Sequence, residues 1–281
     1  MTSMISRFFL LATLLFLPVS LLAQESSSDP RHPLLENDFY ASLGAFLHEK
    51  NVKLGLEGNR ELGLDDINFG KNWKLDSSQT TGSAFLHWRF GEKWSVSGQY
   101  FESNDSARAT LDEDVEWGDY TFRAGTNTGA GIGLTVARFF FGRTLHAGHN
   151  HEFGAGIGAH WLEIEAFIDG EAFVNDESTG YLRERASAGA PLPNIGAWYM
   201  HAFSPEWLLS ARLDWFDASI DTYSGRLINS SLGINYQPFD HFGLSLAYQV
   251  FDLDVNVKES DWKGSVNLHY SGPFMSVTAT W

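Results

Sequence analysis

The amino-acid sequence predicts an all-β protein, an antiparallel transmembrane β-barrel of about ten strands, within a range of roughly eight to twelve. Three observations predict it. Apolar and polar residues alternate along most of the chain, short and long connections follow one another, and no apolar run after residue 23 approaches the length of a spanning helix. Only helices and closed barrels satisfy every backbone hydrogen bond inside lipid. We therefore expect the strands to cross a membrane as a closed sheet.

Alternation is the strongest of these signals. From Trp207 to Trp215 the odd-numbered residues are apolar, whereas Ser210, Arg212 and Asp214 lie between them. A period of two places one set on each face of a strand. The apolar face meets lipid in a barrel, but it would form the core of a soluble sandwich. The alternating stretches run for about 10 to 15 residues, which is long enough for a tilted strand to cross a bilayer and longer than most strands of globular sheets. This length favours the barrel. The same pattern recurs at residues 84–90, 94–100, 228–236 and 242–250.

The connections differ in length and in composition. Three tight ones, at 90–94, 203–207 and 239–242, set aromatic residues around a short polar turn, and 143–151 is expected to be a fourth. Aromatic residues prefer the headgroup level of a membrane, so these read as periplasmic turns beside an aromatic girdle. Longer acidic connections are expected to be extracellular loops. These loops are near residues 51–78, 104–124, 168–182 and 256–262. The glycine-rich stretch 125–141 and the long first loop are ambiguous, which leaves eight or twelve strands as alternatives to ten.

The N-terminal 23 residues are expected to be a cleaved signal peptide. Arg7 precedes an apolar stretch, and Leu21-Leu22-Ala23 offers a cleavage site. The apolar part is shorter than the roughly 20 residues of a spanning helix, and it contains Pro18. We expect residues 24–36 to form a short periplasmic segment and residues 37–281 to form the barrel.

Composition excludes several classes of function. The chain has no cysteine, which leaves no disulfide framework, thiolate zinc site or cysteine nucleophile. Its formal net charge of −16 argues against a nucleic-acid partner, because binding to phosphates needs a basic surface.

The C-terminal residues carry the most specific signal. Met275, Val277, Ala279 and Trp281 alternate with small polar residues up to the last position. In this pattern the chain resembles the outer-membrane β-barrel proteins of Gram-negative bacteria, and it looks most like small porin-like barrels without a named functional family. The resemblance implies a place in the outer membrane, in contact with its lipid and lipopolysaccharide. It also implies recognition by the barrel-assembly machinery through Val277, Ala279 and Trp281.

The last strand contains a change of phase. Val266, Leu268 and Tyr270 are apolar at even positions, but from Met275 onward the apolar residues are odd. One extra residue would produce this change, and Gly272-Pro273 would tolerate it. We therefore expect a β-bulge there.

Six polar residues are predicted to face the lumen under this register. Fixed charges there could select solutes that pass through a channel. Alternatively, the six side chains pack the barrel interior, because about ten strands leave a narrow lumen that side chains can fill. The six residues are His87, Arg89, Arg138, His160, Arg212 and Asp214.

Two further clusters could bind cations. His146, His149 and His151 have a spacing that could hold zinc or copper, but no carboxylate is spaced to complete a known site, so a solvated polar turn is the simpler interpretation. The acidic second loop could bind divalent cations such as calcium or magnesium, but its spacing matches no calcium loop, so solvated charge is the simpler interpretation. Its acidic residues are Asp112, Glu113, Asp114, Glu116 and Asp119. No metal or other cofactor is expected.

The first function hypothesis is a structural or interaction protein with a largely occluded lumen. The second is a channel for ions or small solutes. The third, a lipid-modifying enzyme, has little support, because no motif sets a nucleophile beside a base. Glu163 and Glu165 form a carboxylate pair on one strand face, which a strand leaving the membrane also explains. We therefore expect no enzymatic activity.

Overall fold

The computed structural model describes residues 30–56, 67–75, 79–220, 223–258 and 263–281. The predicted signal peptide, and parts of the predicted segment 24–36 and of the loops 51–78 and 256–262, lie outside the described residues. Within the described ranges, no helix is both long and apolar enough to span a membrane.

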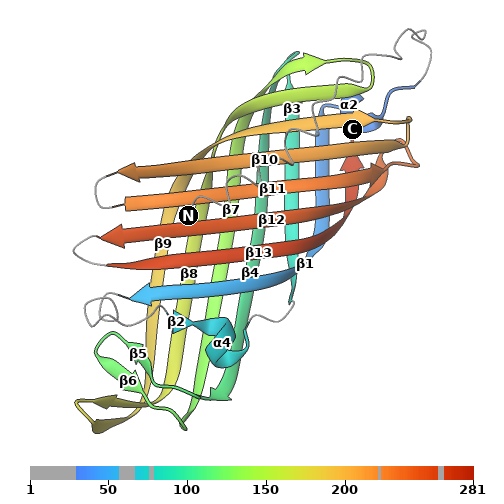
Figure 1. Ribbon diagram of the computed structural model, residues 1–281. Helices are drawn as coiled ribbons and strands as arrows, with labels where there is room; N and C mark the ends of the chain where they lie inside the picture. Colours follow the sequence, from blue (N-terminus) through green and yellow to red (C-terminus); the bar gives the residue numbers. More distant parts are fainter. Residues whose placement is uncertain (1–29, 57–66, 76–78, 221–222, 259–262) are drawn as a thin grey trace, which may run out of the picture. The chain divides into compact units, whose positions relative to one another are not determined.

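Ten long antiparallel strands close into a barrel (Figure 1). The first barrel strand pairs with the last, and the fifth pairs with the sixth, so the circle has no open edge. This confirms the prediction of an all-β barrel with about ten strands. The strands are β1 (Phe39–Leu56), β3 (Gln79–Phe90), β4 (Trp94–Thr110), β7 (Asn127–Ala147), β8 (His151–Val174), β9 (Glu177–Ala202), β10 (Trp207–Ile220), β11 (Tyr223–Tyr236), β12 (Phe242–Lys258) and β13 (Lys263–Thr280).

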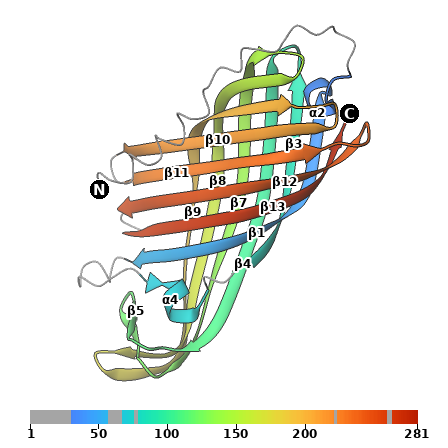
Figure 2. The same cartoon turned by 45° about the vertical axis from the view of Figure 1, so that its right-hand side comes forward.

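The two ends of the barrel differ. One end, which we call the turn end, carries the short connections 91–93, 148–150, 203–206 and 237–241. The short helix α2 (Pro33–Glu36) lies at this end near the C-terminus, as Figures 1 and 2 show. The opposite end, the loop end, carries the smaller elements. They are β2 (Ile67–Asn68), α4 (Phe69–Trp73), β5 (Val115–Trp117) and β6 (Tyr120–Phe122).

The predicted loop 168–182 is wrong. β8 and β9 run through it and meet at a two-residue turn, Asn175-Asp176, with φ angles of 48° and 67°. Two positive φ angles are typical of the tight hairpin turn that matches strand twist, and Asn and Asp tolerate them. Polar residues within this stretch, such as Glu171 and Glu177, are exposed on uninterrupted strands.

At other predicted boundaries, too, the strands are longer and the connections shorter than the sequence indicated. The turn expected at 143–151 is only the three residues between β7 and β8, and the ambiguous stretch 125–141 is mostly β7. The loop expected to begin at residue 104 begins after Thr110, and the hairpin β5–β6 lies within it. Strands that extend past the apolar zone keep their pairing but lose the apolar pattern that identified them.

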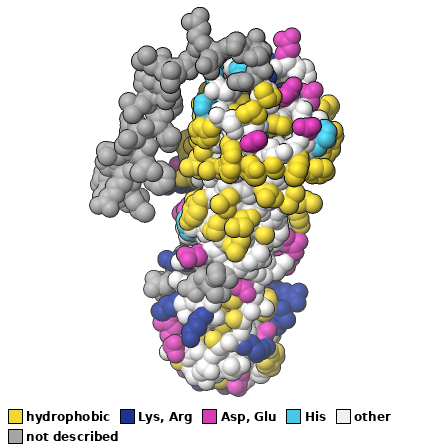
Figure 3. Space-filling model, turned by 90° about the vertical axis from the view of Figure 1, so that its right-hand side faces the viewer, with side chains coloured by type: hydrophobic (Ala, Val, Ile, Leu, Met, Phe, Trp, Pro, Cys, Tyr) yellow, Lys and Arg dark blue, Asp and Glu magenta, His cyan; other side chains and the backbone are white. Residues whose placement is uncertain are grey.

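We call the half of the barrel nearer the turn end the turn half, and the other the loop half. The outer surface of the turn half is an apolar belt. Its side chains are exposed and project from every one of the ten strands, and Figure 3 shows them gathered in one zone beside a zone of charged residues. A continuous exposed apolar surface of this kind requires contact with lipid. The belt includes Leu43, Leu86, Trp88, Val96, Tyr100, Phe139, Phe141, Ile157, Trp161, Ile195, Leu213, Trp215, Leu232, Ile234, Leu244, Leu246, Tyr248, Met275 and Val277.

Toward the loop end the two faces exchange character. On β13, Met275 and Val277 point outward and are more than half exposed, whereas Leu268 and Tyr270 point inward and are 1% exposed. On β8, Trp161 is the last large apolar side chain that is more than half exposed, and the exposed Glu163 and Glu165 follow it on the same face. The outer surface there meets water, and the interior is apolar.

This exchange explains the phase change, and the predicted β-bulge at Gly272-Pro273 is wrong. β13 keeps one register with β12 across that site, and its pairs with β1 on either side, Phe46–Phe274 and Glu49–Ser271, keep the same register. Even-numbered residues of β13 therefore face inward throughout. What changes is the surroundings, from lipid to water. Register irregularities occur elsewhere, near Thr144 on β7 and Ala172 on β8.

Two substitutions on one face of β13 test this division. Met275→Arg places a charge in the belt and should lower the free energy of unfolding by about 2–4 kcal/mol if Met275 lies near the bilayer midplane. Asn267→Arg lies on the same outward face beyond the belt and should change it by less than about 0.5 kcal/mol. Urea titration of the barrel refolded into phospholipid vesicles measures both. Equal losses at the two positions would show that lipid does not cover the belt.

Candidate functional site: the lumen

The loop half of the lumen is filled by a hydrophobic core. Phe101 and Phe251 meet edge to face with ring centroids 5.9 Å apart, and Leu134, Leu162 and Leu253 are almost fully buried around the same interior. This core extends to the elements at the loop end. There Phe69 and Trp73 of α4, Val115 and Trp117 of β5 and Phe122 of β6 join it.

The elements at the loop end are tied to the barrel by a buried polar contact. Trp73 Nε1 donates to Thr128 Oγ1 of β7 at 2.9 Å. A buried indole N–H needs such a partner, so this hydrogen bond fixes how α4 sits on the barrel. Side chains thus occupy the lumen from its middle to the loop end.

A charged layer lies next to this core. Arg138 of β7 donates to both carboxylate oxygens of Asp214 of β10, at 2.6 and 2.9 Å, and neither side chain is more than 1% exposed. A bidentate pair of this kind is strong, and it compensates for removing both charges from water. Gly196 makes it possible, because a Cβ there would lie 2.3 Å from Asp214 Oδ1.

Arg212 and His160 complete the layer. Arg212 donates to Gln99 Oε1 at 2.8 Å, and its Nε lies 3.9 Å from Asp214 Oδ2. His160 is fully buried and contacts Asn194 at 3.2 Å through Nδ1 and Asn229 at 3.1 Å through Nε2.

A second ion pair lies nearer the turn end. Arg89 lies 2.8 Å from a carboxylate oxygen of Glu152 and also donates to the carbonyl of Asn37 at 2.9 Å. The other oxygen of Glu152 accepts from Trp198 Nε1 at 2.9 Å. Glu152 was overlooked in the sequence, because it falls just after the expected turn, yet its alternation with exposed Phe153 would have identified it as inward.

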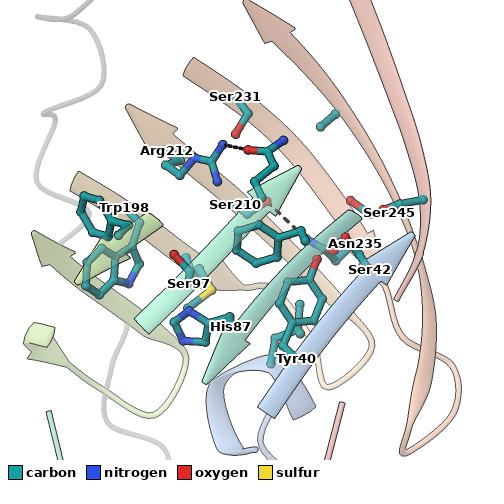
Figure 4. Close-up of a pocket in the computed structure, with 18 of the residues that line it drawn as sticks. Tyr40, Ser42, His87, Ser97, Trp198, Ser210, Arg212, Ser231, Asn235 and Ser245 are labelled. Carbon is teal, nitrogen blue, oxygen red and sulfur yellow. Dashed lines mark hydrogen bonds between the residues drawn. The ribbon is translucent and has the colours of Figure 1, made fainter. Parts of the chain in front are cut away.

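A cavity of about 170 Å³ lies between this pair and the charged layer. Figure 4 shows hydroxyl groups, aromatic rings and the Arg212 guanidinium projecting into it from several strands. Ser210 accepts from Asn235 at 3.2 Å within this wall. The lining includes Tyr40, Ser42, Phe85, His87, Ser97, Trp198, Arg212, Ser231, Ser245 and Ser276.

The segment of α2 covers the turn end of this cavity. Leu34 lines the cavity and packs with Leu35, Ala202 and Leu208 in a small apolar cluster. Arg31 donates to the carbonyls of Gly148 and His149, in the turn between β7 and β8, at 2.9 and 3.1 Å. We call residues 31–36 the cap, since they join opposite parts of the barrel rim.

The six residues predicted to face the lumen all lie in its interior. Arg138, Arg212, Asp214 and His160 form the charged layer, Arg89 belongs to the second pair, and His87 lines the cavity. Sequence reasoning placed each on a face but did not predict which would pair, since Arg138 and Asp214 are 76 positions apart.

The other predicted sites lie outside the lumen. His146 and His151 stack with ring centroids 5.1 Å apart near an exposed His149, and no group of three or more potential metal ligands occurs in the part of the chain that the structure describes. In the acidic loop, Glu113 pairs with Lys71 at 2.7 Å. Glu163 and Glu165 are exposed on the outer face of β8 beyond the belt.

The C-terminal strand closes the barrel. Phe39 and Trp281 exchange two backbone hydrogen bonds, of 2.9 and 3.0 Å, and their rings lie 4.6 Å apart. Val277 and Trp281 are more than half exposed on the outer surface, with Ala279 between them. The predicted assembly residues therefore share the lipid-facing side of the last strand.

Removing Asp214 should be costly. Asp214→Ala leaves Arg138 buried without its counter-ion, and the free energy of unfolding should fall by about 3–5 kcal/mol. Asp217→Ala, on the same strand but exposed, should change it by less than about 0.5 kcal/mol. The double variant Arg138→Met with Asp214→Leu should recover most of the loss. Urea titration in vesicles compares the three, and a single-variant loss below about 1 kcal/mol would contradict the role of the pair.

Docking of the cap should depend on pH. Burial lowers the pKa of His32 from its ordinary value of 6.5 to about 4, against a smaller opposite effect of the Glu206 backbone. The folded cap therefore prefers the neutral imidazole. Its stability is complete above pH 6.5 and is lost as the pH falls from 6.5 toward 4.

Hydrogen exchange of the Leu35 amide, corrected for the intrinsic rate, measures this effect. Protection should decrease across that pH range in the native protein and in His149→Gln, an exposed histidine of the neighbouring turn. It should stay flat in His32→Gln. A persistent decrease in His32→Gln would assign the effect to another group.

Comparison with known proteins agrees with this architecture. No protein-family model and no curated protein matches the chain. Among solved structures it is similar to the outer membrane protease OmpT from Escherichia coli, with a TM-score of 0.54 and 9% identity over 92% of this chain and 100% of that chain. A weaker likeness is to the transport unit of the E. coli autotransporter AIDA-I, with a TM-score of 0.41 and 10% identity over 96% of this chain and 97% of that chain. Another is to the P. putida toluene transporter TodX, with a TM-score of 0.35 and 8% identity over 90% of this chain and 93% of that chain.

At this identity the likeness to OmpT is one of fold. The chain has the fold of Gram-negative outer-membrane β-barrels, and its apolar belt gives it the surface that such a membrane requires. The chain therefore folds as a closed ten-stranded antiparallel β-barrel of the kind seen in Gram-negative outer-membrane proteins.

Proposed function

We propose that this protein is a non-conducting outer-membrane barrel with a structural or interaction role. The observation that carries the proposal is the hydrophobic core across the loop half of the lumen. Water and ions need a polar path, and closely packed apolar side chains such as Phe101, Phe251 and Leu134 deny it. The proposal includes no catalytic step.

The orientation follows from the connections. The short turns and the two termini of the barrel would lie in the periplasm, and the loop end would lie outside the cell. Aromatic side chains of the turn end, such as the stacked pairs Trp94–Phe141 and Trp207–Tyr236, would form the girdle at the periplasmic headgroups. The outward residues of β13, ending in Trp281, would be read by the barrel-assembly machinery.

The loop end would be the interaction surface. β7, β8 and β9, of 21, 24 and 26 residues, are the longest strands, and they extend beyond the belt with an apolar inner face and a polar outer face. On that outer face Tyr181 donates to Asp169 at 2.6 Å, and the Arg183 guanidinium lies 3.9 Å from the centre of the Phe167 ring. These contacts would hold the surface in one shape for a partner or for lipopolysaccharide.

Single-channel recording in planar bilayers tests the proposal. The native barrel should show no unitary current steps. A variant without residues 31–36 should also show none, because the core still seals the loop half. Replacing both Phe101 and Phe251 by Ser in that variant should produce steps. Reproducible steps from the native protein would favour a channel for small solutes and overturn the proposal.

A further inference from the structure

The cavity in the turn half of the lumen has an imbalance of charge. Its lining includes Arg138 and Arg212, and no carboxylate belongs to the lining among the described residues. Asp214 engages Arg138 with both oxygens, whereas Arg212 makes its hydrogen bond to the neutral Gln99. Two guanidinium groups thus share one carboxylate. An uncompensated charge in a protein interior is costly unless a counter-ion is present.

Polar groups around the cavity also have unused hydrogen-bonding capacity. Asn235 Oδ1, Ser276 Oγ and Arg212 Nε are buried and make no hydrogen bond to another protein group. The Arg212 side chain is 17% exposed, although the residue faces the lumen. Ser42, Ser97, Ser231 and Ser245 add hydroxyl groups that can both donate and accept. Such groups are normally paired with protein, water or a ligand.

The size of the cavity limits what could occupy it. About 170 Å³ exceeds the room needed for a single water molecule. It is below the roughly 300–1,000 Å³ of pockets for drug-sized ligands. The rings of Tyr40, Phe85 and Trp198 belong to its lining, and the remaining space suits a small polar molecule.

We propose that this cavity binds a small hydroxylated oxyanion, a molecule that carries a phosphate or carboxylate group beside hydroxyl groups. Arg212 supplies the charge, since guanidinium groups match the geometry of both oxyanions. The serine hydroxyls donate to the remaining oxygens of the anion, and Asn235 Oδ1 accepts from a hydroxyl group of the ligand. The ligand enters from the turn end past Leu34 of the cap, because the core blocks the other direction. This role goes beyond that of a closed barrel, since a lumen sealed at one end still admits a ligand from the other.

Isothermal titration of the full barrel in detergent tests the proposal. The probes are glycerol 3-phosphate, glycerate and glycerol, which share a hydroxylated frame and differ in the charged group. We expect saturable binding with one site for at least one of the two anions and no binding of glycerol at the same concentrations. The comparison of the two anions distinguishes a phosphate from a carboxylate ligand.

Two variants locate the binding, and a third is the control. Arg212→Gln should weaken binding by about tenfold or more, as expected for a hydrogen bond to a charged group. Ser231→Leu fills the cavity without a change of charge and should also abolish binding, which keeps the test valid if Arg212→Gln does not fold. Arg226→Gln, exposed near the loop end of β11, should bind as the native protein does.

Three results would overturn the proposal: no binding of either anion, which leaves a water-filled cavity; equal binding of glycerol; or binding unchanged by both lumen variants. Unitary currents from the native barrel would end the closed-barrel proposal but would leave these binding results unaffected.

Discussion

Closure of the sheet between β1 and β13 controls the rest of the fold. In hydrocarbon an unpaired backbone group costs several kcal/mol, so the barrel has to pair its first strand with its last. The ladder begins at the bonds between Phe39 and Trp281 and continues along β1 to its described end near the loops. Once this ladder is closed, the direction of every side chain is determined by its parity along a strand.

One consequence is that a single register serves two environments. Along β13, Leu268 and Met275 lie on opposite faces, and both are apolar because lipid covers one and the barrel interior surrounds the other. The turn half resembles a membrane protein with a polar interior, whereas the loop half has the inward core of a soluble domain. The boundary inside the lumen lies where Phe251 meets His160, with ring centroids 6.3 Å apart.

The polar interior is itself unevenly paired. Arg89 and Arg138 each have a buried carboxylate partner, but Arg212 shares Asp214 and otherwise contacts a neutral amide. Small residues make room for these contacts. Gly196 admits the Asp214 carboxylate, and Gly154 lets the Trp198 ring lie across β8, where a Cβ would come within 2.1 Å of it. The combination of a sealed loop half and an accessible, positively charged cavity suits ligand binding better than conduction.

The alternating pattern alone was enough to predict the barrel, the approximate number of strands and the faces of Arg138, Arg212 and Asp214, because a period of two beside lipid leaves only one side for polar groups. Which of these groups pair became visible only in the folded barrel, since partners on distant strands meet through barrel closure. It also decided that residues 168–182 are strand and that β13 contains no bulge near Gly272. Beyond the belt, water replaces lipid around the strands, and the apolar face is then the inward one. The local pattern of a strand does not reveal whether lipid or water surrounds it.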